Sequence, residues 1–167
     1  MIRSCLIEKV LLAIRAKWPH GTKDVIFIQQ DNGKPHIDPN DPEFLEVASS
    51  DGFNINLSCQ PPNSLDMNVL NLGFFRVTQS LQHQEAPSTV DDLVNAIEKA
   101  IHDLPSQSLN RVFLTLQQCM IEVTKEFGGK NYKLPHMGKE KLEKYGPLPL
   151  QLGCDCDIVE KAILHLR

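Results

Sequence analysis

The chain has 167 residues, of which 41% are hydrophobic and 23% charged, which excludes wholesale disorder and is typical of a domain able to bury a core. Seventeen lysines and arginines against 21 aspartates and glutamates give a net charge of −4, which excludes nucleic-acid binding through overall basic charge but not through a local basic face. The apolar start, interrupted by Glu8 and Lys9, is too short for a signal peptide or membrane span. We therefore expect no membrane association. Five scattered cysteines suit a reducing compartment, which predicts a nuclear or cytoplasmic location.

The first part of the chain predicts helix, strand, helix and strand, in that order. Apolar residues between positions 4 and 18 recur three and four apart, which predicts an amphipathic helix stopped by Pro19. Val25–Ile28 is an apolar, largely β-branched run, which predicts a strand buried on both faces. A short helix is expected around Glu43–Ser49, and the alternation in Phe53–Leu57 predicts a strand with one buried face.

The rest of the chain predicts helices. One is expected from Asp66 onward, and in it Gly73 allows another segment to approach the backbone closely. Thr89 followed by Asp92 resembles a capping box, with Asp in place of Glu, before a helix that ends at Pro105. Two further helices are expected over residues 109–127 and 157–166, on either side of a loop-rich stretch.

Two polar segments could carry chemistry. Asp31 follows the first predicted strand in Gln29-Gln30-Asp31-Asn32-Gly33-Lys34-Pro35-His36, and a carboxylate at a strand end could hold Mg²⁺ for phosphoryl transfer. Asp-Asn-Gly is equally typical of a plain turn. The second segment, Gln60-Pro61-Pro62-Asn63-Ser64-Leu65-Asp66 and the residues up to Phe75, also fits a capped helix with core residues.

Taken together, the two segments resemble the second and third catalytic motifs of mariner-like transposases, specifically the plant branch. In that family a strand ends in Q-Q-D-N-A-x-P-H, and C-Q-P-P-N-S-P-D-x-N-V-L-D-L-G-F-F follows. The resemblance extends to Ala13-Ile14-Arg15-Ala16-Lys17-Trp18-Pro19 and, near the other end, to Lys133-Leu134-Pro135-His136-Met137-Gly138-Lys139 and Leu148-Pro149-Leu150-Gln151-Leu152. It therefore covers nearly the whole chain.

The resemblance implies a ribonuclease-H-like fold in which three acids gather two Mg²⁺ or Mn²⁺ ions for attack on a phosphodiester. The corresponding fold class is α/β: a truncated ribonuclease-H-like fold with two remaining central strands and flanking helices, followed by C-terminal helices. Residues 1–81 would form the partial catalytic core, and residues 82–167 its helical extension. The family's first acid, on an earlier strand, and its helix-turn-helix DNA-reading region would lie upstream of this sequence.

Residue by residue, Asp31 matches the second acid and is the expected metal ligand. In the plant branch, 39 residues separate the second acid from the third, and here that spacing leads to Asn71. The flanking Asn68-Val69-Leu70 and Leu72-Gly73-Phe74-Phe75 fix this assignment. Asp66 matches the acid of the preceding N-S-P-D element. A helix over residues 66–71 would put Asp66 and Asn71 on different faces, so we expect no rescue by Asp66. Leu65 and Gly33 depart from the family's proline and alanine.

Basic residues mark the candidate nucleic-acid contacts. The segment Lys125–Lys144 contains six lysines and three glutamates, which a solvated face explains most simply but which is also the best candidate for a DNA backbone contact. The candidate contact residues are Lys34, His36, Lys139, Lys141 and Lys144.

With only one of three acids present, the expected function is that of a transposase-derived fragment, inactive as a nuclease, that binds metal weakly or not at all. Its expected partners are DNA and other transposase chains, with no small-molecule substrate evident. Two alternatives stay open: a module that binds nucleic acid or a transposase subunit, and an endonuclease or strand transferase completed by a partner chain. Cys154-Asp155-Cys156 with His165 matches no usual zinc-ligand spacing.

Overall fold

The structure is a computed structural model, and it describes residues 2–19, 24–82, 87–134 and 136–167, apart from the side chains of residues 77, 78, 81 and 82. The chain divides into two compact units, Met1–Ser64 (unit 1) and Leu65–Arg167 (unit 2), which are described separately below. The chain is mixed α/β, 54% helical, with a small two-stranded parallel sheet and flanking helices. The sequence-based division after residue 81 stays a prediction. No helix within the described ranges is long and apolar enough to cross a membrane.

Unit 1 begins with a helical stretch that runs through α1 (Ile2–Cys5), the π-helical η1 (Leu6–Val10) and α2 (Leu11–Lys17). Its apolar stripe packs on the core, where Leu11 is fully buried. Trp18 then turns to extended backbone, with φ −70° and ψ 140°, which ends the helix just before Pro19. The amphipathic helix predicted for this region is therefore confirmed.

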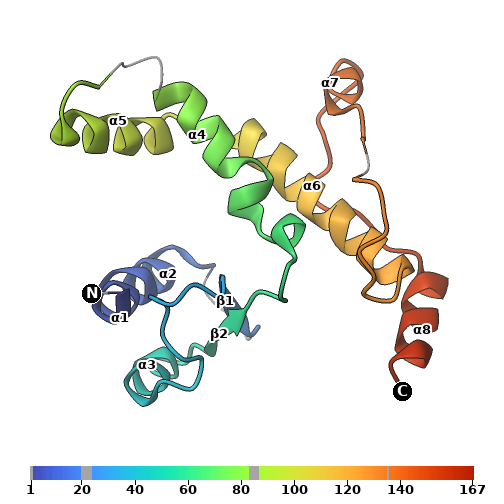
Figure 1. The fold of residues 1–167 in the computed structure, drawn as a ribbon, viewed down its shortest axis with the longest axis horizontal. Coiled ribbons are helices and arrows are strands. Elements are labelled where there is room, and N and C mark those ends of the chain that lie inside the picture. Colours follow the sequence, from blue (N-terminus) through green and yellow to red (C-terminus); the bar gives the residue numbers. More distant parts are fainter. Residues whose placement is uncertain (1, 20–23, 83–86, 135) are drawn as a thin grey trace. The chain divides into compact units, whose positions relative to one another are not determined.

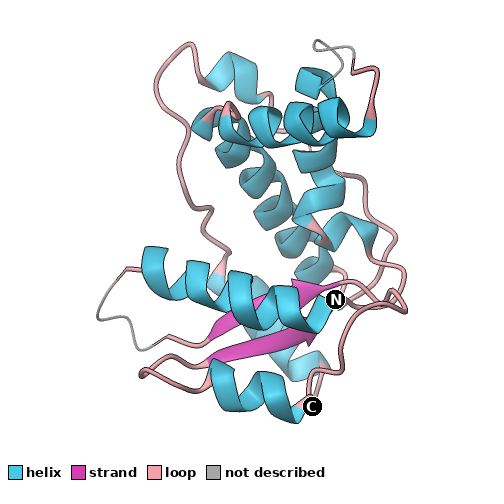
Figure 2. Ribbon diagram, turned by 90° about the vertical axis from the view of Figure 1, so that its left-hand side faces the viewer, coloured by secondary structure: helices cyan, strands magenta, loops and turns pink. Residues whose placement is uncertain are grey.

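The sheet of unit 1 consists of β1 (Ile26–Gln30) and β2 (Ile55–Cys59), which run parallel with Ile26 opposite Ile55 and Gln30 opposite Cys59. Figure 2 shows both strands pointing the same way. Parallel strands need a crossover connection, and here it contains α3 (Pro42–Ala48). Asp41 begins α3 as its N-cap, and its side chain accepts a hydrogen bond from the Phe44 backbone N–H at 3.0 Å.

The core of unit 1 lies on one face of this sheet. Its buried members come from α2, β1, α3 and β2: Leu11, Ile26, Phe44, Ala48, Ile55 and Leu57. Neighbouring residues of a strand point to opposite faces, so Phe27 and Val25, next to Ile26, lie on the other face and are 66% and 44% exposed. The prediction that Val25–Ile28 is buried on both faces is therefore wrong, because the described helices of unit 1 pack on the face of Ile26 and leave Phe27 exposed. The one-sided burial predicted for the second strand is confirmed.

Unit 2 is helical (Figure 1). It starts with the 3₁₀ turn η2 (Leu65–Met67), the π-helical η3 (Leu70–Phe74) and α4 (Phe75–Gln82). It continues with α5 (Val90–His102), α6 (Ser106–Lys125), α7 (Lys139–Leu142) and α8 (Cys156–His165). The predicted capping box is confirmed at α5: Thr89 Oγ1 accepts from the Asp92 backbone N–H, and the Asp92 carboxylate accepts from the Thr89 backbone N–H, both at 3.1 Å.

The close approach expected at Gly73 is present. A Cβ atom on Gly73 would lie 2.9 Å from Val112 Cγ2 of α6, which is nearer than side-chain carbons normally come. The missing side chain therefore lets η3 pack directly against α6.

The prediction of a continuous helix from Asp66 onward is wrong for the first turn. Residues 65–67 form only a 3₁₀ turn, and Asn68 interrupts the helical pattern before η3 begins. The Asn68 side chain accepts a hydrogen bond from the Leu70 backbone N–H at 3.0 Å, an arrangement that restarts a helix locally.

Candidate functional site

The Asp31 turn, which we define as residues 31–36, follows β1 at the carboxyl end of the sheet. The Asp31 side chain is 57% exposed, and its Oδ1 atom accepts a hydrogen bond from the Gly33 backbone N–H at 2.8 Å. The same oxygen lies 2.8 Å from His36 Nε2, whose ring is 32% exposed. Asp31 and His36, both predicted site residues, are thus in direct contact, while Lys34 between them is exposed.

Gly33 controls the shape of this turn. A Cβ atom at position 33 would lie 2.8 Å from Asp31 Oδ1 and 3.3 Å from His36 Cδ2. Alanine, which the resembled family has at this position, would therefore force the carboxylate or the imidazole to move. The glycine therefore leaves room for the Asp31–His36 contact seen here.

Two buried glutamines fasten the ends of the strands beneath this turn. Gln30 is 8% exposed, and its Nε2 donates to the Ile37 carbonyl at 2.7 Å, which ties the segment after the turn back to β1. Gln60 is 6% exposed, its backbone N–H donates to the Gln30 carbonyl at 2.8 Å, and its side-chain amide donates to the Ser64 carbonyl. Asn32 Nδ2 donates to the Gln60 carbonyl at 2.8 Å.

The sequence did not predict that these two glutamines support the turn, although it indicated Asp31, Lys34 and His36 as site residues. The available signal was a glutamine within three residues of the end of each predicted strand, since glutamine is a polar residue that must be hydrogen-bonded when buried. The Gln30 Oε1 atom is buried and has no hydrogen-bond partner within the described residues.

Asn71, at the predicted third-acid position, lies in η3 and is exposed. It belongs to unit 2, whereas Asp31 belongs to unit 1, and their pairing in one site stays a prediction. Within the described ranges, no group of three or more His, Cys, Asp or Glu side chains is placed to hold a metal ion.

Asp66, the other acid of the second motif, has a structural partner. It lies in η2, is partly buried, and its Oδ2 accepts a hydrogen bond from the Tyr132 hydroxyl. Asp66 therefore connects the start of unit 2 to the segment after α6, and the helix-capping role that the sequence allowed for it is not the one it has.

The lysines in α7 and just after it have different environments. Lys139, the first residue of the helix, donates from Nζ to the Arg111 carbonyl and to Thr115 Oγ1 of α6. Burial and the nearby Arg111 charge lower the pKa of Lys139. Lys141 and Lys144 are exposed. The three lysines predicted as one DNA-contact group therefore separate into one that anchors α7 and two that face solvent.

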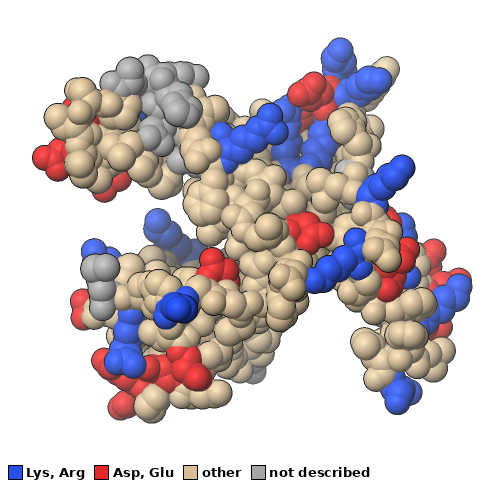
Figure 3. Space-filling model, viewed as in Figure 1, with Lys and Arg blue, Asp and Glu red and all other residues tan. Residues whose placement is uncertain are grey.

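A second ionic contact holds α7 on α6. Arg111 Nε donates to Glu143 Oε1 at 3.0 Å, and a second nitrogen of the guanidinium pairs with Oε2. This bidentate pairing with Arg111 lowers the pKa of the Glu143 carboxyl. Around α7, Figure 3 shows Lys and Arg side chains together with an acidic one, and the exposed Glu140 lies in this helix.

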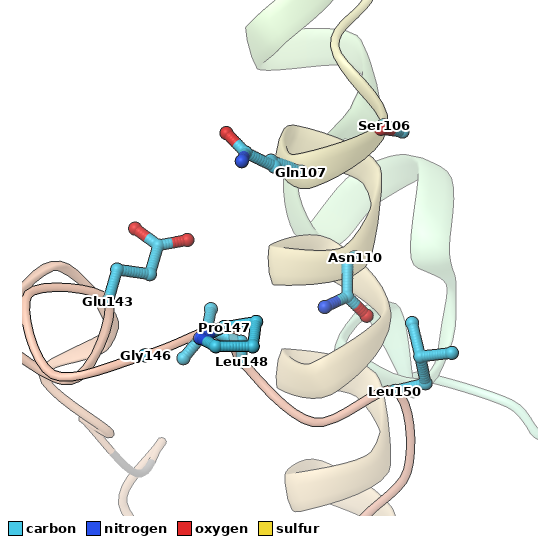
Figure 4. A pocket seen from close by; sticks show the side chains of 8 residues that line it. All are labelled: Ser106, Gln107, Asn110, Glu143, Gly146, Pro147, Leu148 and Leu150. Carbon is cyan, nitrogen blue, oxygen red and sulfur yellow. The ribbon is translucent and has the colours of Figure 1, made fainter.

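A cavity of about 590 Å³ lies between the first turns of α6 and the segment after α7 (Figure 4). Asn110 Nδ2 donates to the Pro149 carbonyl at 3.2 Å and so fastens that segment along the helix. Of the residues lining the cavity, Glu143 is the one that ionises, and it is already paired with Arg111. The others are neutral: Ser106, Gln107, Asn110, Gly146, Pro147, Leu148 and Leu150.

Comparison of the chain with protein-family models, with curated proteins and with solved structures found no match.

Proposed function

We propose that the chain is a transposase-derived protein, related to the mariner-like enzymes of DNA cut-and-paste transposition, that does not itself cleave DNA. The observation that carries the proposal is the pair of motif positions Asp31 and Asn71. The first has a carboxylate at the end of a parallel strand, and the second has a neutral amide whose immediate neighbours on both sides resemble the third catalytic motif. The parallel β1–α3–β2 unit also supports the further proposal that unit 1 is part of a ribonuclease-H-like fold.

The donor chemistry of these residues does not fit a centre of two Mg²⁺ or Mn²⁺ ions. Two divalent cations about 4 Å apart repel each other, and clustered carboxylates are needed to hold them there. Asp31 supplies one negative charge, and its Oδ1 atom already accepts hydrogen bonds from the Gly33 N–H and from His36. Asn71 offers an amide oxygen without charge, so we derive no catalytic step through a metal.

The experiment is a nicking assay on DNA that carries the terminal repeats of a related element, with Mg²⁺ or Mn²⁺, using the chain alone and mixed with a full-length relative. We expect no nicking by the chain alone and none added to the relative's own activity. The Asp31→Asn variant serves as the control. Metal-dependent nicking by the chain that Asp31→Asn abolishes would overturn the proposal. If such nicking appeared only in the mixture with the full-length relative, it would favour the alternative of an endonuclease completed by a partner chain. The relative would then supply the missing acids.

A second candidate function is a binding module for DNA or a transposase subunit, in a nuclear or cytoplasmic setting. The observation that favours it is the exposure of Lys141 in α7 and of Lys144 just after it, where the intervening Glu143 is paired with Arg111. Charges that are free to meet phosphates release counterions on binding, and this makes the affinity salt-dependent.

DNA binding is tested by measuring affinity for duplex DNA against salt concentration. The Lys141→Gln/Lys144→Gln double variant should bind more weakly, and its logarithmic salt slope should fall by about 2, because each phosphate that a lysine neutralises contributes about 0.9 to the slope. The matched control, Lys9→Gln/Lys161→Gln, removes the same charge from exposed residues elsewhere and should leave the slope unchanged. Equal slopes for both double variants would refute a contact through α7.

A further inference from the structure

Two cysteines flank one residue at the start of α8. Cys154 and Cys156 are both exposed, and the Asp155 between them is the N-cap of the helix. The Asp155 side chain accepts a hydrogen bond from the Asp157 backbone N–H at 3.0 Å, and its carbonyl accepts from the Ile158 N–H at 3.1 Å. These bonds hold the backbone between the two thiols in one conformation.

That conformation brings the cysteines within reach of each other. Asp155 has φ −64° and ψ 131°, which is polyproline II backbone. At a rise of about 3.1 Å per residue, the Cα atoms on either side of such a residue are about 6 Å apart. Disulfides join Cα atoms about 4.4–6.8 Å apart, so the N-cap geometry of α8 is compatible with a bond between Cys154 and Cys156.

The remaining cysteine of unit 2 is of a different kind. Cys119 lies in α6 with no exposed surface, and burial raises the pKa of its thiol, which keeps it protonated and unreactive. A metal site shared with His165 is also disfavoured. That residue lies nine positions beyond Cys156, about 13 Å along the helix, and its ring stacks on Phe127 with the ring centres 4.5 Å apart.

We propose that Cys154 and Cys156 form a thiol–disulfide modification site whose co-substrate is a small disulfide of the glutathione type. The thiolate of one cysteine attacks a sulfur of the small disulfide, forms a mixed disulfide and releases one thiol molecule. The second cysteine attacks the protein sulfur of the mixed disulfide and releases the other. Two protein thiols are oxidised to one disulfide, and the small disulfide is reduced to two thiols.

The resulting bond is one that the cell's thiols can reverse. A disulfide that spans a single residue closes a small ring, and an exposed or strained disulfide is more easily reduced than a structural one. The site is therefore a modification site, and it does not depend on the function proposed above.

The test uses the full chain, exposed under native conditions to glutathione disulfide, then blocked with iodoacetamide and digested with trypsin. Cleavage after Lys144 and Lys161 gives one peptide, residues 145–161, that contains both cysteines. We expect this peptide to lose two hydrogens, to take up no iodoacetamide, and to carry no glutathione. A moderate excess of glutathione should restore both thiols.

Single variants separate an intramolecular bond from simple surface oxidation. In Cys154→Ser and in Cys156→Ser, the remaining thiol should retain glutathione, because no second thiol is present to displace it. The control variant Cys5→Ser/Cys59→Ser removes the exposed cysteines of unit 1 and should leave the result for peptide 145–161 unchanged. Alkylation of both thiols after oxidation, one glutathione on each, or a bond from either cysteine to a different peptide would each overturn the proposal.

Discussion

The contact between Gly73 and Val112 gives the sharpest test of the packing that holds η3 on α6. A Cβ atom at position 73 would lie 2.9 Å from Val112 Cγ2, although carbon atoms in contact prefer about 3.5–4.0 Å. Val112 is buried and helical, and a helical valine has essentially one side-chain rotamer, so it cannot turn aside cheaply. We therefore expect Gly73→Ala to destabilise the protein.

The magnitude follows from two opposing contributions. Forcing an extra methyl into a packed contact costs about 1–3 kcal/mol, whereas replacing a helical glycine by alanine gains up to about 1 kcal/mol. The net loss for Gly73→Ala is then about 1 kcal/mol. In a Val112→Ala background the clashing Cγ atoms are gone and the nearest remaining atom, Val112 Cβ, is 3.7 Å away, which is an ordinary contact. There the same glycine change should stabilise by up to about 1 kcal/mol.

The assay is urea unfolding followed by circular dichroism on the wild type, both single variants and the double variant. The reversal of sign between backgrounds is the expected result, with a coupling energy of about 1–3 kcal/mol. Gly153→Ala is the control glycine, since a Cβ there would meet nothing within 4 Å. A Gly73→Ala variant as stable as the wild type, or one with the same effect in both backgrounds, would refute the packing argument.

Three further changes probe unit 1. Phe44→Ala empties a fully buried position and should lower the free energy of unfolding by about 3–5 kcal/mol. Unfolding followed by the fluorescence of Trp18, the single tryptophan, should then occur at a lower denaturant concentration, and an unchanged midpoint would contradict the prediction. The hydrogen bonds from the Phe44 N–H and from Arg3 hold the pKa of Asp41 below its usual range. The ionised carboxylate therefore stabilises the fold at pH values above the ordinary carboxyl pKa, and this stabilisation is lost as the pH falls through the lowered pKa. Asp41→Asn keeps the cap and should flatten the loss of stability as the pH falls through and below the ordinary carboxyl range. An unaltered loss of stability in acid would show that another group is responsible. Gly33→Ala should break the hydrogen bond between the residue-33 amide and the Asp31 carboxylate, at a cost of at most about 1 kcal/mol. The amide of residue 33 should then exchange its hydrogen faster, and an unchanged exchange rate would count against the steric argument.

Local patterns predicted most of the individual elements. The capping box at Thr89, the apolar stripes of α2 and α6, and the alternation in β2 each depend on a few neighbouring residues, and the structure has them. Gly73 could be predicted for a similar reason, because a glycine inside an apolar helical run indicates a close neighbour.

What the patterns could not predict depends on contacts between distant residues. A run such as Val25–Ile28 shows that a strand is apolar but not how many of its faces are covered, and here Phe27 is exposed. The charge of Lys139 likewise says nothing about whether its ammonium group meets solvent or, as here, the carbonyl of Arg111. The break at Asn68 was hidden because the residues on both sides are compatible with helix, and the partner of Asp66 is 66 positions away at Tyr132.

The two candidate functions respond differently to the loss of acidic residues, which is why they can be separated. Holding two divalent cations requires several carboxylates at one point, and under the proposed function Asn71 stands at the third-acid position with an amide that supplies no charge. Contact with a phosphate backbone requires only exposed cations, and each contributes nearly independently through counterion release. The proposed DNA contact through Lys141 and Lys144 therefore does not require metal-binding carboxylates. Restoring the acid alone, by Asn71→Asp, should leave DNA affinity at fixed salt unchanged, whereas a large loss of affinity would place Asn71 itself in the DNA contact.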